Sequence, residues 1–260
     1  MSGLTVLVVG ATGSIGRHVV VEALASGHTV RALVRSRERG AVLPAAAELV
    51  VGDVTRPQTL GAAVEGVDAI VFTLGSDSQG ADGARQIDYE GVRNVLAALS
   101  GRRVRVALMT AIGVTDREGH YNRTTQAHDW KRRSERLLRA SGHDFTIVRP
   151  GWFDYNTPDQ HQLVFLQGDR RHAGTPADGV VARKQIAQVL VASLTSDAAR
   201  RKTLELVAET GPSQADLEPL FATLATDPAN SLDAVDDLPN MPLADEPESV
   251  RADLDAATPR

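Results

Sequence analysis

The sequence predicts an α/β fold, a doubly wound, Rossmann-like parallel sheet with helices on both faces. Two observations predict it. Short apolar runs typical of buried strands alternate with helix-like stretches along most of the chain. The first apolar run also leads through a glycine-rich turn into an amphipathic stretch. Right-handed crossovers between parallel strands follow from this order, and such sheets bind ligands at the carboxyl ends of their strands.

These patterns predict seven strands and five helices. The strands are expected at residues 4–9, 29–34, 48–51, 69–73, 104–109, 144–148 and 203–207. The helices are expected near residues 14–26, 57–64, 83–99, 127–141 and 185–194. Gly27, Gly101 and Gly142 directly follow three of the helices, where a left-handed cap is favoured. Segment 151–183 shows no clear periodicity, and we expect it to form a small lobe on the substrate side of the cleft.

Length and composition favour one large domain. The 260 residues are 42% hydrophobic and include no cysteine, which excludes disulfides and thiolate chemistry. The seven histidines are scattered, so no metal site is expected. No apolar run is long enough to span a bilayer, and the first residues do not resemble a signal peptide. We therefore expect a cytoplasmic protein with no membrane partner and a small-molecule substrate, as a monomer or homodimer.

The acidic residues are concentrated near the C-terminus. Residues 1–211 are expected to form the main domain, including segment 151–183, and residues 212–260 a C-terminal extension. From Asp227 onward, nine acidic residues face two arginines, which leaves a charge of +2 on the rest of the chain. That balance does not indicate a nucleic-acid partner. We expect residues 227–260 to be loosely ordered. Alternatively, they pack on the body or on a second subunit through Leu232, Leu238, Met241 and Leu243.

The glycine-rich turn predicts a nucleotide site. Gly10, Gly13 and Gly16 are spaced three apart between the first strand and the first helix. Such a turn directs backbone N–H groups and the positive end of a helix dipole at the pyrophosphate of a dinucleotide. The residues expected to line it are Gly10, Thr12, Gly13, Ser14, Ile15 and Gly16.

The end of the second strand indicates which dinucleotide. An acid there would bind the ribose 2′-hydroxyl of NAD, whereas this chain has Arg35, followed by Ser36, Arg37 and Arg39. Because guanidinium groups pair with phosphate, Arg35 and Arg39 favour NADP(H) over NAD(H). The alternative is an ordinary solvated basic turn.

Two further strand ends are expected to line the cofactor. Asp53 can accept a hydrogen bond from the adenine amino group while Val54 packs against the ring, or Asp53 is a turn or capping residue. The fourth strand ends in Thr73-Leu74-Gly75, where a small residue would let the cofactor pass.

In these motifs and their order the chain resembles the atypical short-chain dehydrogenase/reductase superfamily, and above all its flavin-reductase-like and biliverdin-reductase-like branch. Gly10-Ala-Thr-Gly13-x-x-Gly16 resembles the phosphate loop, and Asp88-Tyr89-x-Gly91-x-x-Asn94 the central helix. Val148-Arg149-Pro150-Gly151 resembles the turn after the sixth strand. The resemblance covers residues 4–207 and implies that Pro150 and Trp152 lie along the nicotinamide.

The catalytic pair that the resemblance implies is incomplete. The superfamily uses Tyr-x-x-x-Lys on the helix after the fifth strand, with a Ser/Thr partner. Lys131 matches the lysine and Thr110 the Ser/Thr partner, but Ala127 occupies the tyrosine position. Tyr121 lies ten positions before Lys131, in an expected loop. The tyrosine normally gives a proton to a carbonyl as hydride arrives, so ordinary ketone reduction would lose its donor.

Two accounts of the missing tyrosine stay open. In one, Lys131 and Thr110 only position the ligands, and a flavin or quinone takes its proton from water. In the other, His128, Tyr121 or His120 replaces the acid. The arginines that follow Lys131 are expected to form a solvated helix face. Trp152 and Phe153 would stack on a flat substrate or fill the core.

The sequence therefore predicts an NADPH-dependent oxidoreductase that transfers hydride to a planar acceptor such as a flavin or quinone. One alternative is a non-catalytic NADP(H)-binding redox sensor or regulatory protein, because a sensor needs no proton donor. Another is an enzyme like the nucleotide-sugar epimerases and dehydratases, although these also use a base at the tyrosine position.

Overall fold

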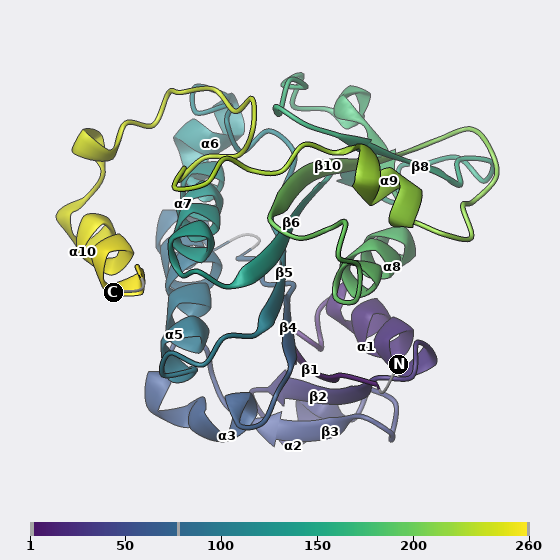
Figure 1. Cartoon of the computed structure of the whole chain (residues 1–260), viewed down its shortest axis with the longest axis vertical. Helices are drawn as coiled ribbons and strands as arrows, with labels where there is room; N and C mark the ends of the chain where they lie inside the picture. Colours follow the sequence, from purple (N-terminus) through teal and green to yellow (C-terminus); the bar gives the residue numbers. More distant parts are fainter. Residues whose placement is uncertain (1–2, 77–78, 259–260) are drawn as a thin grey trace.

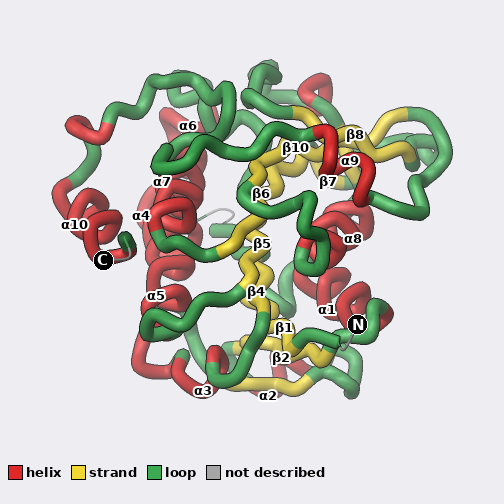
Figure 2. The backbone as a smooth tube through the Cα atoms, in the orientation of Figure 1, coloured by secondary structure: helices red, strands yellow, loops and turns green. Residues whose placement is uncertain are grey.

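The computed structural model describes residues 3–76 and 79–258, and its strands form a single sheet (Figures 1 and 2). Seven strands run parallel in the order β3-β2-β1-β4-β5-β6-β10. They are β1 (Thr5–Val9), β2 (Thr29–Val34), β3 (Glu48–Val51), β4 (Ala69–Phe72), β5 (Arg105–Met109), β6 (Asp144–Pro150) and β10 (Lys202–Glu209). All seven predicted strands are present. The winding reverses between β1 and β4, and in such sheets ligands bind beside that reversal.

Helices cover both faces of the sheet, as predicted. On one face, α1 (Gly16–Ala25) packs against α8 (Arg183–Ser193) (Figure 1). The other face is covered by α3 (Gly61–Val64), α5 (Glu90–Ala98) and α7 (Ala127–Ala140).

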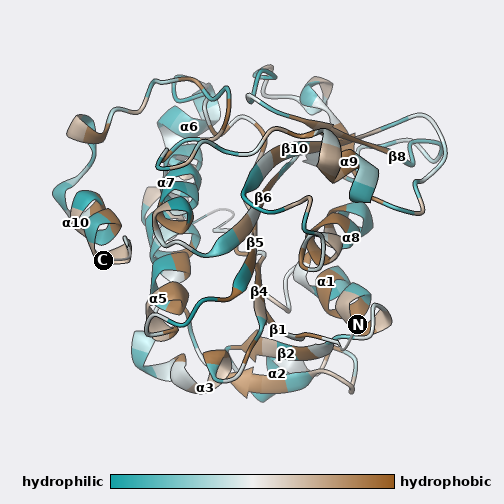
Figure 3. Ribbon diagram, viewed as in Figure 1, coloured by the Kyte–Doolittle hydropathy of each residue, from teal (hydrophilic) through white to brown (hydrophobic). Residues whose placement is uncertain are grey.

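Alternate residues of β1 supply the two cores. Val6 and Val8 point to the α1 side and Leu7 and Val9 to the α5 side, all fully buried. Figure 3 shows the apolar character of β1 and β2, in contrast to the hydrophilic α7. Each buried side chain of this size contributes roughly 1.5–3 kcal/mol.

Two predicted helices differ in detail. Residues 57–64 form a 3-10 turn, η1 (Pro57–Thr59), and then the four-residue α3. Residues 83–99 are preceded by α4 (Gly80–Gly83) and contain a π-helical segment, η2 (Ala84–Tyr89), before α5. Short helices also form at α2 (Arg37–Gly40) and α6 (His120–Thr125).

Segment 151–183 extends the sheet. It contains β7 (Trp152–Phe153), β8 (Gln162–Leu166), the 3-10 turn η3 (Pro176–Asp178) and β9 (Val180–Val181). Strands β8 and β9 pair antiparallel with β10, and β7 pairs with β9. The lobe is thus built onto the far edge of the sheet, next to β10.

The C-terminal extension is packed on the body, in contrast to the expected loose tail. It contains α9 (Glu218–Thr223), η4 (Leu243–Asp245) and α10 (Glu248–Ala257), and it runs along α7 (Figure 1). Val250 and Leu254 of α10 are buried with Trp130 and Leu137 of α7. Of the apolar residues expected to hold it, Met241 is 3% exposed but Leu243 is 45% exposed.

Ion pairs also join the extension to α7. The arginines of α7 were expected to face solvent, but this prediction is wrong: Arg132, Arg133, Arg136 and Arg139 are all buried. Each pairs with a carboxylate of the extension, in the pairs Arg132–Asp233, Arg133–Glu246, Arg136–Asp233, Arg136–Glu246 and Arg139–Asp227. Buried arginines need such partners. Within residues 3–76 and 79–258, no helix is long and apolar enough to cross a membrane.

Candidate active site

The turn between β1 and α1 has the geometry of a phosphate loop. Gly10 has φ +89°, and a Cβ there would lie 2.8 Å from the carbonyl oxygen of Thr73. The Thr73 hydroxyl donates to the carbonyl oxygen of Val9, at 3.2 Å, which ties β4 to the turn. A Cβ on Gly16 would collide with the backbone of Gly10, so α1 can begin here only with glycine.

The loop residues fit a pyrophosphate. Gly13 and Ser14 are exposed, whereas Ile15 is buried and anchors the loop in the core. In the described part of the chain, the backbone N–H groups of Thr12, Ser14 and Ile15 donate to no protein acceptor. Unpaired N–H groups at the start of a helix favour a bound anion.

The basic residues after β2 are free to meet a ligand. Arg35 and Arg39 are exposed, and no carboxylate in the described residues forms an ion pair with either. Arg35 is close enough to Asp53 to affect its titration. Partial burial raises the pKa of Asp53, but hydrogen bonds from Thr55 and the charges of Arg35 and Arg56 outweigh it, so the pKa is lowered.

Asp53 and Val54 are held in a compact turn after β3. Asp53 Oδ1 accepts hydrogen bonds from the N–H and hydroxyl of Thr55, at 2.9 and 2.8 Å. The carbonyl of Val54 accepts from the buried Asn94 side chain at 2.7 Å, and a Cβ on Gly91 would lie 3.2 Å from Val54. The motif residues Gly91 and Asn94 therefore hold α5 against the expected adenine segment. Of the small residues after β4, Gly75 is exposed, whereas Leu74 is half-buried.

Lys131 is held by a buried carboxylate. Its Nζ lies 2.8 Å from Oδ1 of Asp88, whose Oδ2 accepts from the Ser76 hydroxyl at 2.5 Å. The Lys131 side chain is 13% exposed and that of Asp88 is 2% exposed. Asp88 belongs to the π-helical segment η2, and such segments often occur at functional sites. The motif residue Asp88 thus fixes the predicted lysine at the carboxyl edge of the sheet.

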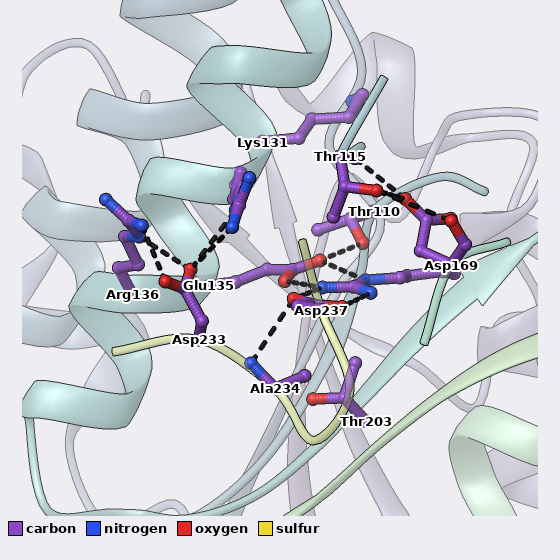
Figure 4. Close-up of polar contacts among 12 residues, drawn as sticks. Thr110, Thr115, Lys131, Glu135, Arg136, Asp169, Thr203, Asp233, Ala234 and Asp237 are labelled. Carbon is purple, nitrogen blue, oxygen red and sulfur yellow. Dashed lines mark hydrogen bonds and ion pairs between the residues drawn. The ribbon is translucent and has the colours of Figure 1, made fainter. Parts of the chain in front are cut away.

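Thr110 belongs to a buried network. Its hydroxyl donates to Glu135 Oε1 at 2.7 Å, and Thr110 is only 3% exposed (Figure 4). The Arg149 guanidinium donates two hydrogen bonds to Glu135, at 3.0 and 2.7 Å, and two to Asp237, at 2.7 and 2.8 Å. Because Glu135 takes its one hydroxyl proton, Thr110 can only accept a hydrogen bond from a ligand.

Tyr121 and His128 lie together at the start of α7. Tyr121 was expected in a loop but lies in α6, because residues 120–125 form their own short helix. Its ring centroid is 5.1 Å from that of His128, and Tyr121 is 51% exposed. His128 Nδ1 is buried without a hydrogen-bond partner in the described residues, and burial lowers the pKa of His128. Ala127, in the expected tyrosine position, is packed in the core beside Trp130, while His120 is exposed.

The segment after β6 presents an aromatic pair at the same edge. The carbonyl of Pro150 accepts from Ile112 N–H at 3.0 Å. Trp152 and Tyr155 meet edge to face at 6.0 Å, and Tyr155 is 63% exposed.

An acidic side chain of this segment caps α8, the helix that packs against α1: Asp154 Oδ1 accepts from the N–H of Arg183 at 3.0 Å. Partial burial raises the pKa of Asp154, but hydrogen bonds and charge from Arg183, together with the charge of His18 in the first turn of α1, lower it overall.

Sequence reasoning missed Glu135, Arg149 and Asp169 as parts of this region. The available signal was the position of Arg149 itself, a charged residue that directly continues the buried strand residues Phe145 to Val148. A charge in that position requires a buried partner. No group of three or more His, Cys, Asp or Glu side chains in residues 3–76 and 79–258 is arranged to hold a metal ion.

Comparison with known proteins agrees with this geometry. A family model described as NAD(P)H-binding matches residues 10–197. The Photosystem II assembly factor Ycf39 of Synechocystis sp. is 29% identical over 208 residues, which cover 78% of this chain and 62% of that protein. The uncharacterized sugar epimerase YhfK of Bacillus subtilis is 30% identical over 209 residues, which cover 78% of this chain and 94% of that protein.

Solved structures share the fold. A putative NAD-dependent epimerase/dehydratase from Bacillus halodurans aligns over 85% of this chain and all of its own, with TM-score 0.68 and 24% identity. The anaerobilin reductase ChuY of Escherichia coli O157:H7 aligns over 80% of this chain and all of its own, with TM-score 0.63 and 21% identity. A short-chain dehydrogenase/reductase from Veillonella parvula, in complex with NADP, aligns over 82% of this chain and 99% of its own, with TM-score 0.60 and 16% identity.

Proposed function

The chain belongs to the NAD(P)H-binding family, within the atypical short-chain dehydrogenase/reductase superfamily, and from this we propose that it is an NADPH-dependent reductase of a planar acceptor such as a flavin or quinone. Bound NADPH would supply hydride. The protein's part is to hold the pyrophosphate on the N–H groups of residues 12–15 and the 2′-phosphate on Arg35 and Arg39. Two structural relatives are consistent with this proposal. ChuY is described as a reductase, and the Veillonella parvula protein is described in complex with NADP.

The single observation that carries the acceptor class is the pair of aromatic residues after β6. Tyr155 is 63% exposed and braced by Trp152, and the neighbouring Asp154 accepts a hydrogen bond from the first N–H of α8, the helix that packs against α1. An exposed, braced aromatic side chain offers a flat ligand a stacking surface. Lys131, on α7, is fixed by Asp88 and can bind ribose hydroxyls without acting as an acid.

The test is a mixture of the purified protein with NADPH and a panel of flavins, quinones and simple ketones, followed by the loss of reduced-nicotinamide absorbance. We expect rapid loss with a flavin or quinone and none with simple ketones. The variant Tyr155→Ala should raise the KM for the acceptor about tenfold and leave that for NADPH unchanged. Tyr121→Ala, which removes the other exposed aromatic, serves as the comparison.

Tight NADPH binding without turnover of any acceptor would contradict the proposal and favour a redox sensor instead. Interconversion of nucleotide sugars without net loss of NADPH would favour the epimerase-like alternative, which the name of the Bacillus subtilis relative suggests for that protein.

A further inference from the structure

A buried carboxylate, Asp169, braces the loop that follows β5. Its side chain has no exposed surface, and its backbone is left-handed at φ +46°. Oδ1 accepts from Gly113 N–H at 2.6 Å, and Oδ2 accepts from the N–H and hydroxyl of Thr115 at 2.7 and 2.8 Å (Figure 4). Both carboxylate oxygens are thus engaged by the loop, and they fix the backbone between Gly113 and Thr115.

The same carboxylate orients His172. Nε2 of His172 lies 3.2 Å from Oγ1 of Thr115 and 3.7 Å from Oδ2 of Asp169. A threonine hydroxyl has one proton, and Thr115 gives it to Asp169, so Thr115 must accept from His172. The ring therefore carries its fixed proton on Nε2, which leaves Nδ1 as the atom that binds and releases a proton.

The loop between Gly113 and Thr115 connects His172 to the proposed site. It begins four residues after the end of β5, and a Cβ on Gly113 would lie 3.5 Å from the ring of His128 on its other side. His128 lies one helical turn before Lys131 on α7. Asp169 and His172 come from the lobe that follows β6, so the lobe and α7 meet the same loop from two directions.

The other groups around this loop are poorly suited to give a proton. The Thr110 hydroxyl already donates its proton to Glu135. Burial lowers the pKa of His128, so its protonated form is scarce at neutral pH. The nearby carboxylate of Asp169 raises the pKa of His172 above its usual value; partial burial opposes this, and the charge of Asp116 adds to it. The His172 side chain is 25% exposed, so it can exchange protons with solvent.

We propose that His172 is the acid that replaces the missing tyrosine, with Asp169 and Thr115 as its positioning residues. This inference rests on the proposed reductase function. With a quinone as acceptor, hydride from NADPH reduces the ring and leaves one oxygen with a negative charge. The Nδ1–H bond of protonated His172 breaks, the proton goes to that oxygen, and solvent then reprotonates Nδ1. The products are NADP⁺ and the hydroquinone, with one proton consumed.

The test compares His172→Gln with His161→Gln, a change of an exposed histidine in the same lobe. Steady-state oxidation of NADPH by a benzoquinone is followed from pH 5.5 to 9. We expect wild-type kcat to fall as pH rises through the pKa of His172, because the protonated form is the active one. His172→Gln should lower kcat about a hundredfold at pH 6, remove the pH dependence and leave the Kd for NADPH unchanged. His161→Gln should behave as wild type.

A second measurement does not depend on turnover. Nitrogen-15 NMR of the histidine rings should show His172 protonated at Nε2 throughout, with Nδ1 titrating above the ordinary histidine value. Thr115→Val, which removes the hydroxyl that accepts from Nε2, should lower the pKa of His172. Titration of His172 at or below the ordinary histidine value would overturn the inference.

The two proposals can fail separately. If wild type reduces the quinone and His172→Gln keeps the wild-type rate and pH profile, His172 is not the acid and the reductase function stands. If wild type binds NADPH but reduces no acceptor, the reductase function falls and the role of His172 falls with it.

Discussion

Arg149 and Asp237 are 88 positions apart in the chain, yet two hydrogen bonds of 2.7 and 2.8 Å join their fully buried side chains. The same guanidinium forks onto Glu135, so the C-terminal extension is joined through one arginine to the helix that carries Lys131. Burial raises the pKa of Asp237, but the hydrogen bonds and charge of Arg149 and the charges of Arg139 and Arg132 outweigh it, so the pKa is lowered.

The contact between Arg149 and Asp237 should stabilise the folded protein by several kcal/mol. Asp237→Asn keeps the shape but removes a buried charge from the network, and we expect it to lower the free energy of unfolding by about 3 kcal/mol. Asp236→Asn changes an exposed neighbour and should cost less than about 0.5 kcal/mol. Urea unfolding at pH 7 measures both. Equal stability of the two variants would show that the extension is not held by this pair.

Glu205 should make stability depend on pH in the opposite sense from most carboxylates. It is 2% exposed, and burial raises its pKa to about 7 despite the charge of Arg149. The folded protein therefore holds a proton that the unfolded chain has released above about pH 4.5. The stabilisation from this group is complete at lower pH and is lost as pH rises toward 7.

Glu205→Gln should remove that loss. At pH 8 we expect the variant to be more stable than wild type, by up to about 3 kcal/mol, and at pH 4.5 to show little advantage. Glu209→Gln, an exposed change on the same strand, is the matched control. Thermal unfolding across this pH range decides the matter; a wild-type profile for Glu205→Gln would mean that Glu205 is ionised in the fold.

Lys131 should matter for turnover separately from stability. Lys131→Ala leaves Asp88 buried without its cationic partner, so we expect both lower stability and at least a tenfold loss of kcat/KM for NADPH. The double variant Lys131→Met/Asp88→Asn removes both charges and should recover most of the stability but not the activity. Lys184→Ala, on the exposed surface of α8, should change neither. Full activity in the double variant would remove Lys131 from the site.

Arg35 should select the phosphorylated dinucleotide. Arg35→Glu places a negative charge where the 2′-phosphate is expected, and we predict about a hundredfold weaker NADPH binding with less than a threefold change for NADH. The control is Arg37→Glu, which makes the same change of charge at an exposed residue two positions further on. Calorimetric titration with both dinucleotides provides the comparison, and equal losses for NADPH and NADH would contradict the assignment.

The parallel strands could be predicted because their signal is local: each is a short run of apolar residues such as Val6 to Val9 or Ile70 to Phe72. The tight turn after β1 was predictable for the same reason, since Gly10 and Gly16 satisfy backbone requirements within one turn. The burial of the α7 arginines could not be predicted. Arg132 and Arg136 look solvent-exposed in the sequence, because their partner Asp233 follows about a hundred residues later. His172 was missed because its orientation comes from Thr115 and Asp169, which only the folded loop brings together.

The ion pairs along α7 also set an order of events during synthesis. The ribosome completes α7 and all seven parallel strands before it has released Asp227, Asp233 and Glu246. Until then, four arginines on one helix lack the carboxylates that neutralise them in the folded protein. The charge pairing of α7 is therefore completed only after the extension residues that follow the sheet have been made.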